Sequence, residues 1–318
     1  MAKRMLQIAH ILDPWKKINP PLDSSIRLAW AASEAGHVNW YVQAEDLMWQ
    51  KGNVVAHARA FTIPESADAI AYEKEHFLNL SDVDAIFLRK DPPFDSEYLH
   101  HLHLLSLIPN RPLCINDPVA IRNHNEKMST LAYPEYIPPT AIARKISEIR
   151  SLVKDMGGRA VLKPLHLFGG KNIFVVDLTD RNFNAIAEVV TEHETHTIMV
   201  QKYLEEISKG DIRVLLIDGQ MLGSFTRIAG AESYRSNVAA GGRWYPYELN
   251  ESERKMVDHV AQDARSKGLY FLGLDLIGGK LTEINVTSPT GLPALNELTG
   301  RRNELTIIHW LEQKLGVN

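Results

Sequence analysis

Residues 274–286 read Leu-Asp-Leu-Ile-Gly-Gly-Lys-Leu-Thr-Glu-Ile-Asn-Val, two apolar runs on either side of a Gly-Gly-Lys turn. This pattern is typical of a β-hairpin. Three side chains that carry oxygen atoms, Asp275, Glu283 and Asn285, interrupt the otherwise core-like strands. Because side chains alternate between the two faces of a strand, Glu283 and Asn285 point the same way.

A carboxylate in an apolar strand needs a partner, because removing its charge from water is costly. Mg²⁺ is one such partner, since it prefers oxygen ligands and commonly binds one or two carboxylates together with substrate phosphates. Asp275, Glu283 and Asn285 would form a suitable set. The alternative is a solvated strand face with ordinary surface acids, and the hairpin alone leaves both interpretations open.

The turn decides whether one ion can reach all three groups. A plain two-residue turn would place Asp275 opposite Thr282, so that Asp275 and Glu283 would point to opposite faces. A three-residue loop at Gly278–Lys280 would instead place Asp275 opposite Glu283. Because glycine adopts left-handed backbone at little cost, we expect this bulged turn.

The same register would place Gly273 opposite Asn285. Because glycine has no side chain, we expect Gly273 to leave room for a phosphate or a metal beside Asn285.

Composition limits the classes of function. The 318 residues are enough for two or three domains with a sizeable core. Thirty-five basic and 39 acidic residues give a net charge of −4, which argues against a nucleic-acid partner. No apolar run is long enough to span a membrane. Cys114 is the only cysteine, so an intramolecular disulfide is excluded, which fits a reducing cytoplasm.

The first third of the chain favours a parallel α/β sheet. Apolar stretches at 5–12, 38–42, 85–88 and 113–115 read as strands, and Asp23 is a suitable cap for a helix that ends near Ala35. In such sheets ligands bind at the carboxyl ends of the strands, where Asp13 and Arg89-Lys90-Asp91 lie. The alternative interpretation of Arg89-Lys90-Asp91 is a rigid surface turn.

Residues 140–201 favour a small α+β unit. Strand-like stretches at 140–143, 160–163, 173–176 and 197–201 alternate with helical stretches at 146–156 and 182–193. The loop at 164–172 contains Gly169-Gly170 but matches neither a P-loop nor a dinucleotide fingerprint. Its glycines would let backbone N–H groups approach a phosphate. The alternative interpretation is a plain hairpin turn between two strands.

The last third has hairpins that carry arginine. Asp218-Gly219-Gln220 is a turn signal between apolar stretches at 212–217 and 221–227. Arg213 and Arg227 lie within these stretches, and a guanidinium there needs an anion, whether carboxylate or phosphate. An amphipathic helix at 251–267 precedes the hairpin at 274–286, and two helices are expected after that hairpin.

Several strings in this chain are specific. They are Leu-Arg-Lys-Asp-Pro-Pro-Phe-Asp at 88–95, Asn-Glu-Lys at 125–127, Asn-Val-Ala-Ala-Gly-Gly-Arg at 237–243 and Thr-Glu-Ile-Asn-Val-Thr-Ser-Pro-Thr at 282–290. With the order of the three units, they resemble the ATP-grasp carboxylate–amine ligases, and within these the bacterial glutathione synthetases. The resemblance runs nearly end to end. It implies an α/β chain with an N-terminal parallel α/β domain at 1–125, an α+β lid at 126–203 and a C-terminal α+β catalytic domain at 204–318.

The resemblance implies an ATP-dependent ligase that joins γ-glutamylcysteine to glycine through an acyl phosphate and releases ADP and phosphate. ATP would be the co-substrate, and Mg²⁺, or Mn²⁺ in its place, the metal. The family is commonly a cytoplasmic homotetramer, and no nucleic-acid or membrane partner is implied.

The resemblance also assigns residues, class by class. It implies that the catalytic residues are Arg213 and Arg227. It implies that the nucleotide site comprises Lys127, Lys163, Gly169, Gly170, Gln201, Tyr203, Leu204 and Asp211. It implies that the substrate site includes Asn237, Arg243, Ser288 and Thr290. It implies that the metal ligands are Asp275, Glu283 and Asn285.

The chain departs from the family pattern in three places, one of them after Thr290, where it continues Gly291-Leu292-Pro293-Ala294. The family's lid loop is usually Asp-Gly-x-Gly-Gly, and here residues 166–170 read His-Leu-Phe-Gly-Gly. The family's Ile-Pro-x-x-Gly-Glu segment is replaced at 228–234. Two alternatives therefore stay open: a related ligase that joins a different acid and amine, and a non-catalytic ATP-binding protein. The intact Lys127, Lys163 and Arg213, with the metal set, argue against the second.

Overall fold

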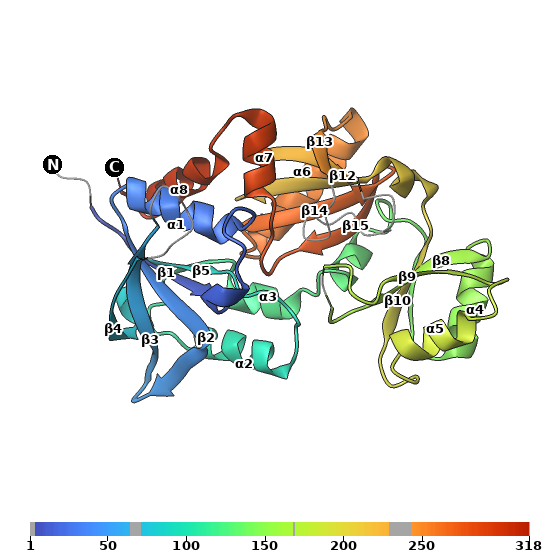
Figure 1. Cartoon of the computed structure of the whole chain (residues 1–318), viewed down its shortest axis with the longest axis horizontal. Helices are drawn as coiled ribbons and strands as arrows, with labels where there is room; N and C mark the ends of the chain where they lie inside the picture. Colours follow the sequence, from blue (N-terminus) through green and yellow to red (C-terminus); the bar gives the residue numbers. More distant parts are fainter. Residues whose placement is uncertain (1–3, 64–70, 168, 229–242, 318) are drawn as a thin grey trace.

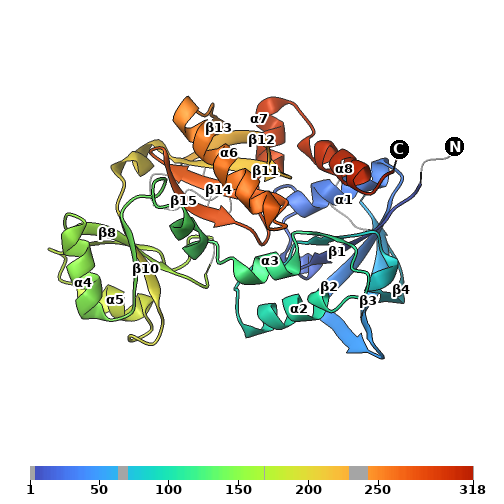
Figure 2. The same ribbon diagram turned by 180° about the vertical axis from the view of Figure 1, so that it is seen from behind.

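Three β-sheets follow one another along the chain. The computed structural model describes residues 4–63, 71–167, 169–228 and 243–317. Within these residues the sheets have six, four and five strands. The six-stranded sheet lies at one end of the molecule and the four-stranded sheet at the other, with the five-stranded sheet between them (Figures 1 and 2). No described helix combines the length and apolar character needed to cross a bilayer.

The N-terminal sheet has the strand order β4-β3-β2-β1-β5-β6. Its strands are β1 (Gln7–Leu12), β2 (Val38–Gln50), β3 (Asn53–Thr62), β4 (Ala71–Asn79), β5 (Ala85–Leu88) and β6 (Leu113–Ile115). Its helices are α1 (Ser24–Glu34), α2 (Ser96–Ser106) and α3 (Pro118–Asn123). Strands β2, β1, β5 and β6 are parallel, as the sequence predicted.

The sequence did not reveal two further strands, which are antiparallel, at the other edge of this sheet. Strand β2 continues to Gln50 and turns through Lys51-Gly52 into β3. Strand β3 is antiparallel to β2, and β4 is antiparallel to β3. Both turn residues have positive φ, 52° and 85°, which is the backbone of a tight hairpin. The alanines of β3 have weak strand propensity, which explains why the pattern did not reveal the strand.

The sequence correctly predicted the cap of α1 and the residues at the carboxyl edge of this sheet. The Asp23 side chain accepts a 2.6 Å hydrogen bond from the Ser25 backbone N–H and so caps α1. Strands β1 and β5 are parallel neighbours that end at Leu12 and Leu88. Asp13 and Arg89 therefore lie at the same carboxyl edge, as expected.

The four-stranded sheet has the order β7-β10-β8-β9. Its strands are β7 (Thr140–Ala143), β8 (Arg159–Pro164), β9 (Phe174–Asp177) and β10 (Ile198–Lys202), with helices α4 (Ile146–Asp155) and α5 (Phe183–Val190). Both helices pack with one set of alternating strand residues, including Leu162 and Val200. The next residues, Lys163 and Gln201, therefore lie on the face that the helices do not cover.

The five-stranded sheet is antiparallel throughout, with the order β13-β12-β11-β14-β15. Its strands are β11 (Asp211–Ile217), β12 (Gln220–Ile228), β13 (Arg243–Pro246), β14 (Phe271–Ile277) and β15 (Lys280–Asn285). Helix α6 (Glu251–Ser266) covers one face (Figure 2), and α7 (Leu292–Thr299) and α8 (Asn303–Lys314) follow. Short 3₁₀ helices span Trp15–Lys17, Leu80–Asp82, Met128–Ala132 (η3) and Glu205–Lys209 (η4).

The β14–β15 hairpin has the expected register but reaches it by another device. Ile277 pairs with Lys280, so the turn contains only Gly278 and Gly279, both with positive φ. The predicted three-residue loop is therefore wrong. The extra residue is Thr282, since Leu276 pairs with Leu281 while Asp275 pairs with Glu283. This bulge in β15 still makes Asp275 and Glu283 direct cross-strand neighbours, as predicted.

Gly273 pairs with Asn285, as expected, but its role differs from the one expected. A Cβ atom on Gly273 would lie 3.3 Å from both Cδ and Nη1 of Arg213. The space above Gly273 is thus filled by the Arg213 side chain, and the glycine makes room for that arginine.

Asn116 ties the first sheet to the third. This buried side chain accepts hydrogen bonds from the backbone N–H groups of Tyr270 (2.6 Å) and Phe271 (2.7 Å). It donates to the carbonyl oxygens of Phe271 (2.8 Å) and Val286 (2.7 Å). One side chain therefore satisfies four backbone groups on two segments of the third unit.

We expect Asn116→Ala to lower the free energy of unfolding by about 3 kcal/mol, because several buried backbone groups lose their partner. Urea unfolding of the full chain would measure this. The control is Asn184→Ala, at an exposed position of α5, which should change the free energy by less than about 0.5 kcal/mol. Equal effects of the two substitutions would contradict this account of Asn116.

Candidate active site

A row of charged side chains crosses one face of the five-stranded sheet. The register places Asp211 opposite Arg227, and Arg213 opposite Asp275. Asp275 in turn lies opposite Glu283. Residues opposite one another in antiparallel strands share a face, so β12, β11, β14 and β15 each contribute a charge to one row.

The Arg213–Asp275 pair lies in the middle of this row. Arg213 donates from Nε to Oδ1 (2.6 Å) and from Nη2 to Oδ2 (3.0 Å) of Asp275, and from Nη1 to the Thr290 carbonyl (2.8 Å). Both side chains are buried. Arg227 donates from Nε to Asp211 (3.1 Å), and its Nη2 also lies 3.1 Å from Asp275. The expectation that each arginine meets an anion is confirmed, with protein carboxylates as the anions.

Two guanidinium groups control the ionisation of Asp275. Burial alone would raise the pKa of this carboxyl group, but Arg213 and Arg227 outweigh burial and hold the pKa well below its ordinary value. Asp275 therefore stays ionised near neutral pH.

Two lysines approach the row from the lid side. The Lys127 ammonium is buried, lies 3.1 Å from Glu283 Oε1 and donates to the Leu167 carbonyl (2.6 Å). Lys163 donates to Gln201 Oε1 (2.8 Å) from the uncovered face of the four-stranded sheet. Burial, reinforced by the charge of Lys127, lowers the pKa of Lys163 to about 8 despite the acids nearby.

Many of the predicted residues line a single pocket of about 200 Å³. These are Gly169, Arg213, Arg227, Asp275, Glu283, Asn285, Ser288 and Thr290. They come from the lid loop, from four strands of the third sheet and from the segment after β15. The structure thus brings together residues that are up to 121 positions apart in the sequence (169 to 290).

Other predicted residues lie outside this pocket. Asp211 is the partner of Arg227. Gln201 lies in β10, and Tyr203 and Leu204 lie between β10 and η4. The Tyr203 ring centroid is 3.9 Å from the Arg159 guanidinium.

The remaining predicted residues lie on loops and at a strand end. Gly170 is in the lid turn. Arg243 is exposed at the start of β13. Asn237 and Phe168 lie outside the described residues.

The proposed metal ligands suit a hard cation by their chemistry. Asp275 Oδ2 lies 3.2 Å from Asn285 Nδ2, and both residues line the pocket with Glu283. In the described part of the chain, no group of three or more His, Cys, Asp or Glu side chains is placed to hold a metal. The set here has two carboxylates and one amide, which fits Mg²⁺ because substrate phosphates commonly supply its other ligands.

The sequence placed Arg89 at the ligand-binding edge of the first sheet but predicted no specific role for its side chain. Its buried guanidinium lies 5.4 Å from the Phe271 ring centroid, and Nε donates to Ser25 Oγ (3.1 Å). Neither terminal nitrogen has a hydrogen-bond partner within the described chain. The signal was visible as an arginine directly after β5, at the carboxyl edge of the sheet.

Arg89 lines a second pocket of about 370 Å³ together with Asp13, Lys17 and Lys171. This pocket shares Asp91 and Pro92 with the first one. Burial raises the pKa of Asp91 to about 6, although Arg89 opposes the shift. The two pockets therefore form neighbouring parts of one region, where the terminal nitrogens of Arg89 have no partner among the described residues.

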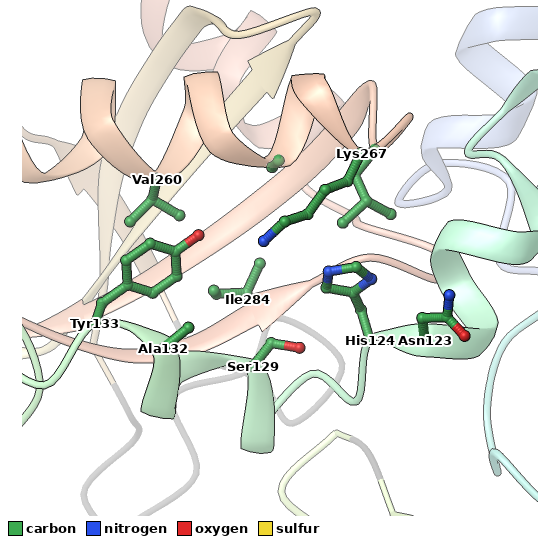
Figure 3. A pocket seen from close by; sticks show the side chains of 10 residues that line it. Asn123, His124, Ser129, Ala132, Tyr133, Val260, Lys267 and Ile284 are labelled. Atoms are coloured by element: carbon green, nitrogen blue, oxygen red, sulfur yellow. The ribbon is translucent and has the colours of Figure 1, made fainter.

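A third cavity, of about 220 Å³, lies on the other side of β15 (Figure 3). His124, Ser129, Tyr133 and Lys267 contribute to its wall, and Ile284 forms part of its floor. Ile284 alternates with Glu283 and Asn285 and so points away from the charged row. Strand β15 thus separates this cavity from the candidate active site.

Comparisons with known proteins agree with this architecture. Residues 6–122 match the family described as prokaryotic glutathione synthetase, N-terminal domain, and residues 126–300 match its ATP-grasp domain. The chain is 38% identical to a glutathione synthetase of Gloeobacter violaceus, with 96% of each chain covered. It is also 38% identical to one of Vibrio cholerae, with 90% of this chain and 91% of that protein covered.

Solved structures support the fold. D-cycloserine synthetase DcsG superposes with a TM-score of 0.67 at 14% identity, over 96% of this chain and 99% of that one. The ATP-grasp ligase PsnB, in a complex with a precursor variant, Mg and ADP, gives a TM-score of 0.65 at 14% identity, over 97% and 98% of the two chains. At this identity the likeness concerns the fold alone. With the family matches over nearly its whole length, the chain has the ATP-grasp fold and belongs to the prokaryotic glutathione synthetase family of ADP-forming carbon–nitrogen ligases.

Proposed function

We propose that this chain joins γ-glutamylcysteine to glycine and cleaves ATP to ADP and phosphate. The observation that carries the proposal is a row of charges beside one pocket, formed by the buried Arg227, Asp211, Arg213 and Asp275 and the partly buried Glu283. With Lys127 and Lys163 facing it from the lid side, the row offers cations to phosphate groups and oxygen ligands to a metal.

The reaction has two steps. A cysteine carboxylate oxygen attacks the γ-phosphorus of ATP, and ADP leaves. The amine nitrogen of glycine then attacks the acyl carbon, loses a proton, and phosphate departs from the tetrahedral intermediate. Lys127 and Lys163 hold the nucleotide phosphates, while Arg213 and Arg227 stabilise negative charge as it develops on the oxygens.

Asp275, Glu283 and Asn285 would hold Mg²⁺, or Mn²⁺ in its place. The bound ion would neutralise charge on the transferring phosphoryl group. The chain's own contribution is to keep Asp275 ionised, because Arg213 and Arg227 lower its pKa. Asn285 is oriented by its hydrogen bond to the Gly273 carbonyl (3.2 Å).

The two adjoining pockets accommodate the acid substrate. Ser288 and Thr290 line the pocket beside Arg213, and the unpaired nitrogens of Arg89 offer a second site for a carboxylate. The proposal keeps Asn237 and Arg243 as further substrate residues on family resemblance alone.

Four further points belong to the proposal. The adenine lies near Gln201, Tyr203 and Leu204, with Gly169, Gly170 and Asp211 completing the nucleotide site, on family resemblance. The division into domains at 125/126 and 203/204, a cytoplasmic location and a homotetramer are proposed on the same ground. A single cysteine fits that location, and Cys114 is buried with its pKa raised to about 12.

We expect one ADP, one phosphate and one glutathione for each turnover with Mg²⁺, γ-glutamylcysteine and glycine. Quantifying all three products in one assay would test this. AMP and pyrophosphate as products would overturn the mechanism. Turnover only with another acid or amine would identify a related ligase, and nucleotide binding without turnover would identify a non-catalytic protein.

We expect Arg213→Ala to lower kcat by about 10²–10³, because the lost charge acts mainly on the developing oxyanion. The dissociation constant for ATP should change much less. The control is Arg265→Ala, which removes an exposed guanidinium that pairs with Asp218 at the far end of β11. Unchanged turnover in Arg213→Ala would make Arg213 a purely structural partner of Asp275.

We expect ATP affinity to fall as the pH rises above about 8. Lys163 has a pKa of about 8, so it carries its charge below that pH and loses it above. Phosphate prefers the charged form, so binding weakens through this window. Lys163→Arg should flatten the profile because arginine stays protonated. Isothermal titration between pH 7 and pH 9.5, on the wild type and this variant, would measure the effect; identical profiles would contradict it.

A further inference from the structure

Glu126 occupies the short segment that joins the first unit to the second. Its Oε1 accepts three hydrogen bonds: from the backbone N–H of Val286 (3.0 Å), the backbone N–H of Thr287 (3.1 Å) and the Thr287 hydroxyl (2.8 Å). Its own carbonyl accepts from the Ile284 N–H (2.9 Å). One residue thus holds the chain where it leaves β15.

The two neighbours of Glu126 hold the lid loop instead. Asn125 donates from its side-chain amide to the Leu165 carbonyl (2.8 Å). Lys127 donates from its ammonium group to the Leu167 carbonyl (2.6 Å). Three consecutive residues therefore connect the lid loop with the segment that follows β15.

That segment, residues 286–290, sets the position of two arginines. The Thr290 carbonyl accepts from Arg213 Nη1 (2.8 Å). The Ser288 hydroxyl donates to the carbonyl of Arg89 (3.3 Å). A shift of the segment would therefore move one contact of the central arginine and one contact at the second pocket.

A negatively charged carboxylate is electrostatically unfavourable at position 126. Burial and the nearby Glu283 raise the pKa of Glu126, and the Thr287 donors only partly offset this. An apolar residue would avoid the repulsion from Glu283, but it would leave the N–H groups of Val286 and Thr287 without their acceptor. The structure therefore retains an acid beside another acid where three donors converge.

We propose that Glu126 is a positioning residue that fixes residues 286–290 against Arg213 and so keeps ATP cleavage coupled to amide formation. This inference rests on the proposed function. A loosened segment opens one wall of the pocket, so water reaches the acyl phosphate and competes with the amine. The acyl carbon–oxygen bond then breaks by hydrolysis, giving back the free acid and phosphate.

The first test measures glutathione formed per ATP cleaved. The wild type should give a ratio near one. Glu126→Ala should lower the ratio at least several-fold, with the KM for ATP changed much less. Glu126→Gln should restore most of the coupling, because its Oε1 still accepts hydrogen bonds. Thr287→Val removes a single hydrogen bond and should give an intermediate ratio, and it carries the test if Glu126→Ala fails to fold.

A matched control is Glu253→Ala. Glu253 is also buried and also accepts several hydrogen bonds, from Tyr247 and Asn250, but it caps α6 away from the pocket. It should lose stability without loss of coupling. A ratio near one in both Glu126→Ala and Thr287→Val, or equal uncoupling in Glu253→Ala, would overturn the inference.

The second test does not depend on turnover. The reference for this test is hydrogen exchange of the Val286 and Thr287 amides in Glu253→Ala. Exchange should be at least tenfold faster than this in Glu126→Ala. It should be at least severalfold faster in Thr287→Val. Equal exchange would overturn the inference. If the wild type makes no glutathione while these amides respond as expected, the proposed function fails and the positioning by Glu126 stands.

Discussion

The buried contact between Arg213 and Asp275 is the constraint on which the active-site architecture depends. Both side chains are withdrawn from water, and each would be very costly to bury alone. A buried ion pair adds little net stability, so its retention is better explained by chemistry than by folding. The pair requires β11 and β14 to be neighbours in a fixed register, and Gly273 favours it, since a Cβ there would lie only 3.3 Å from Arg213 and would force that side chain to shift.

The rest of the site is arranged around that pair. The bulge at Thr282 turns Glu283 toward Asp275. Arg227 and Asp211 extend the row on the other side, and Lys127 closes it from the interdomain segment. Each cation that faces the first pocket is held by a protein acid or amide. We therefore expect these cations to exchange their protein partners for phosphate oxygens when a nucleotide binds. Because the cations are already in place, the site is preorganised for phosphate.

How much the sequence could predict depended on how local each signal was. The Asp23 cap, the strand at Thr140–Ala143 and the pairing of Asp275 with Glu283 follow from side-chain chemistry within a short segment, and the structure has them. The position of the bulge was not accessible, because a Gly-Gly-Lys turn is compatible with either loop length. The unpaired nitrogens of Arg89 were not accessible either, because they depend on packing against Phe271, far away in the sequence.

The altered lid loop is compatible with the family's chemistry because the first unit and the residues that directly follow it contact the backbone of the loop. The Phe94 N–H donates to the His166 carbonyl (3.3 Å), and Asn125 and Lys127 donate to the carbonyls of Leu165 and Leu167. A backbone carbonyl is present whatever side chain the residue carries. Substitution of the family's acid and first glycine in this loop therefore leaves these closing contacts available. The departure is then expected to affect how freely the loop opens, while the groups that face the phosphates stay in place.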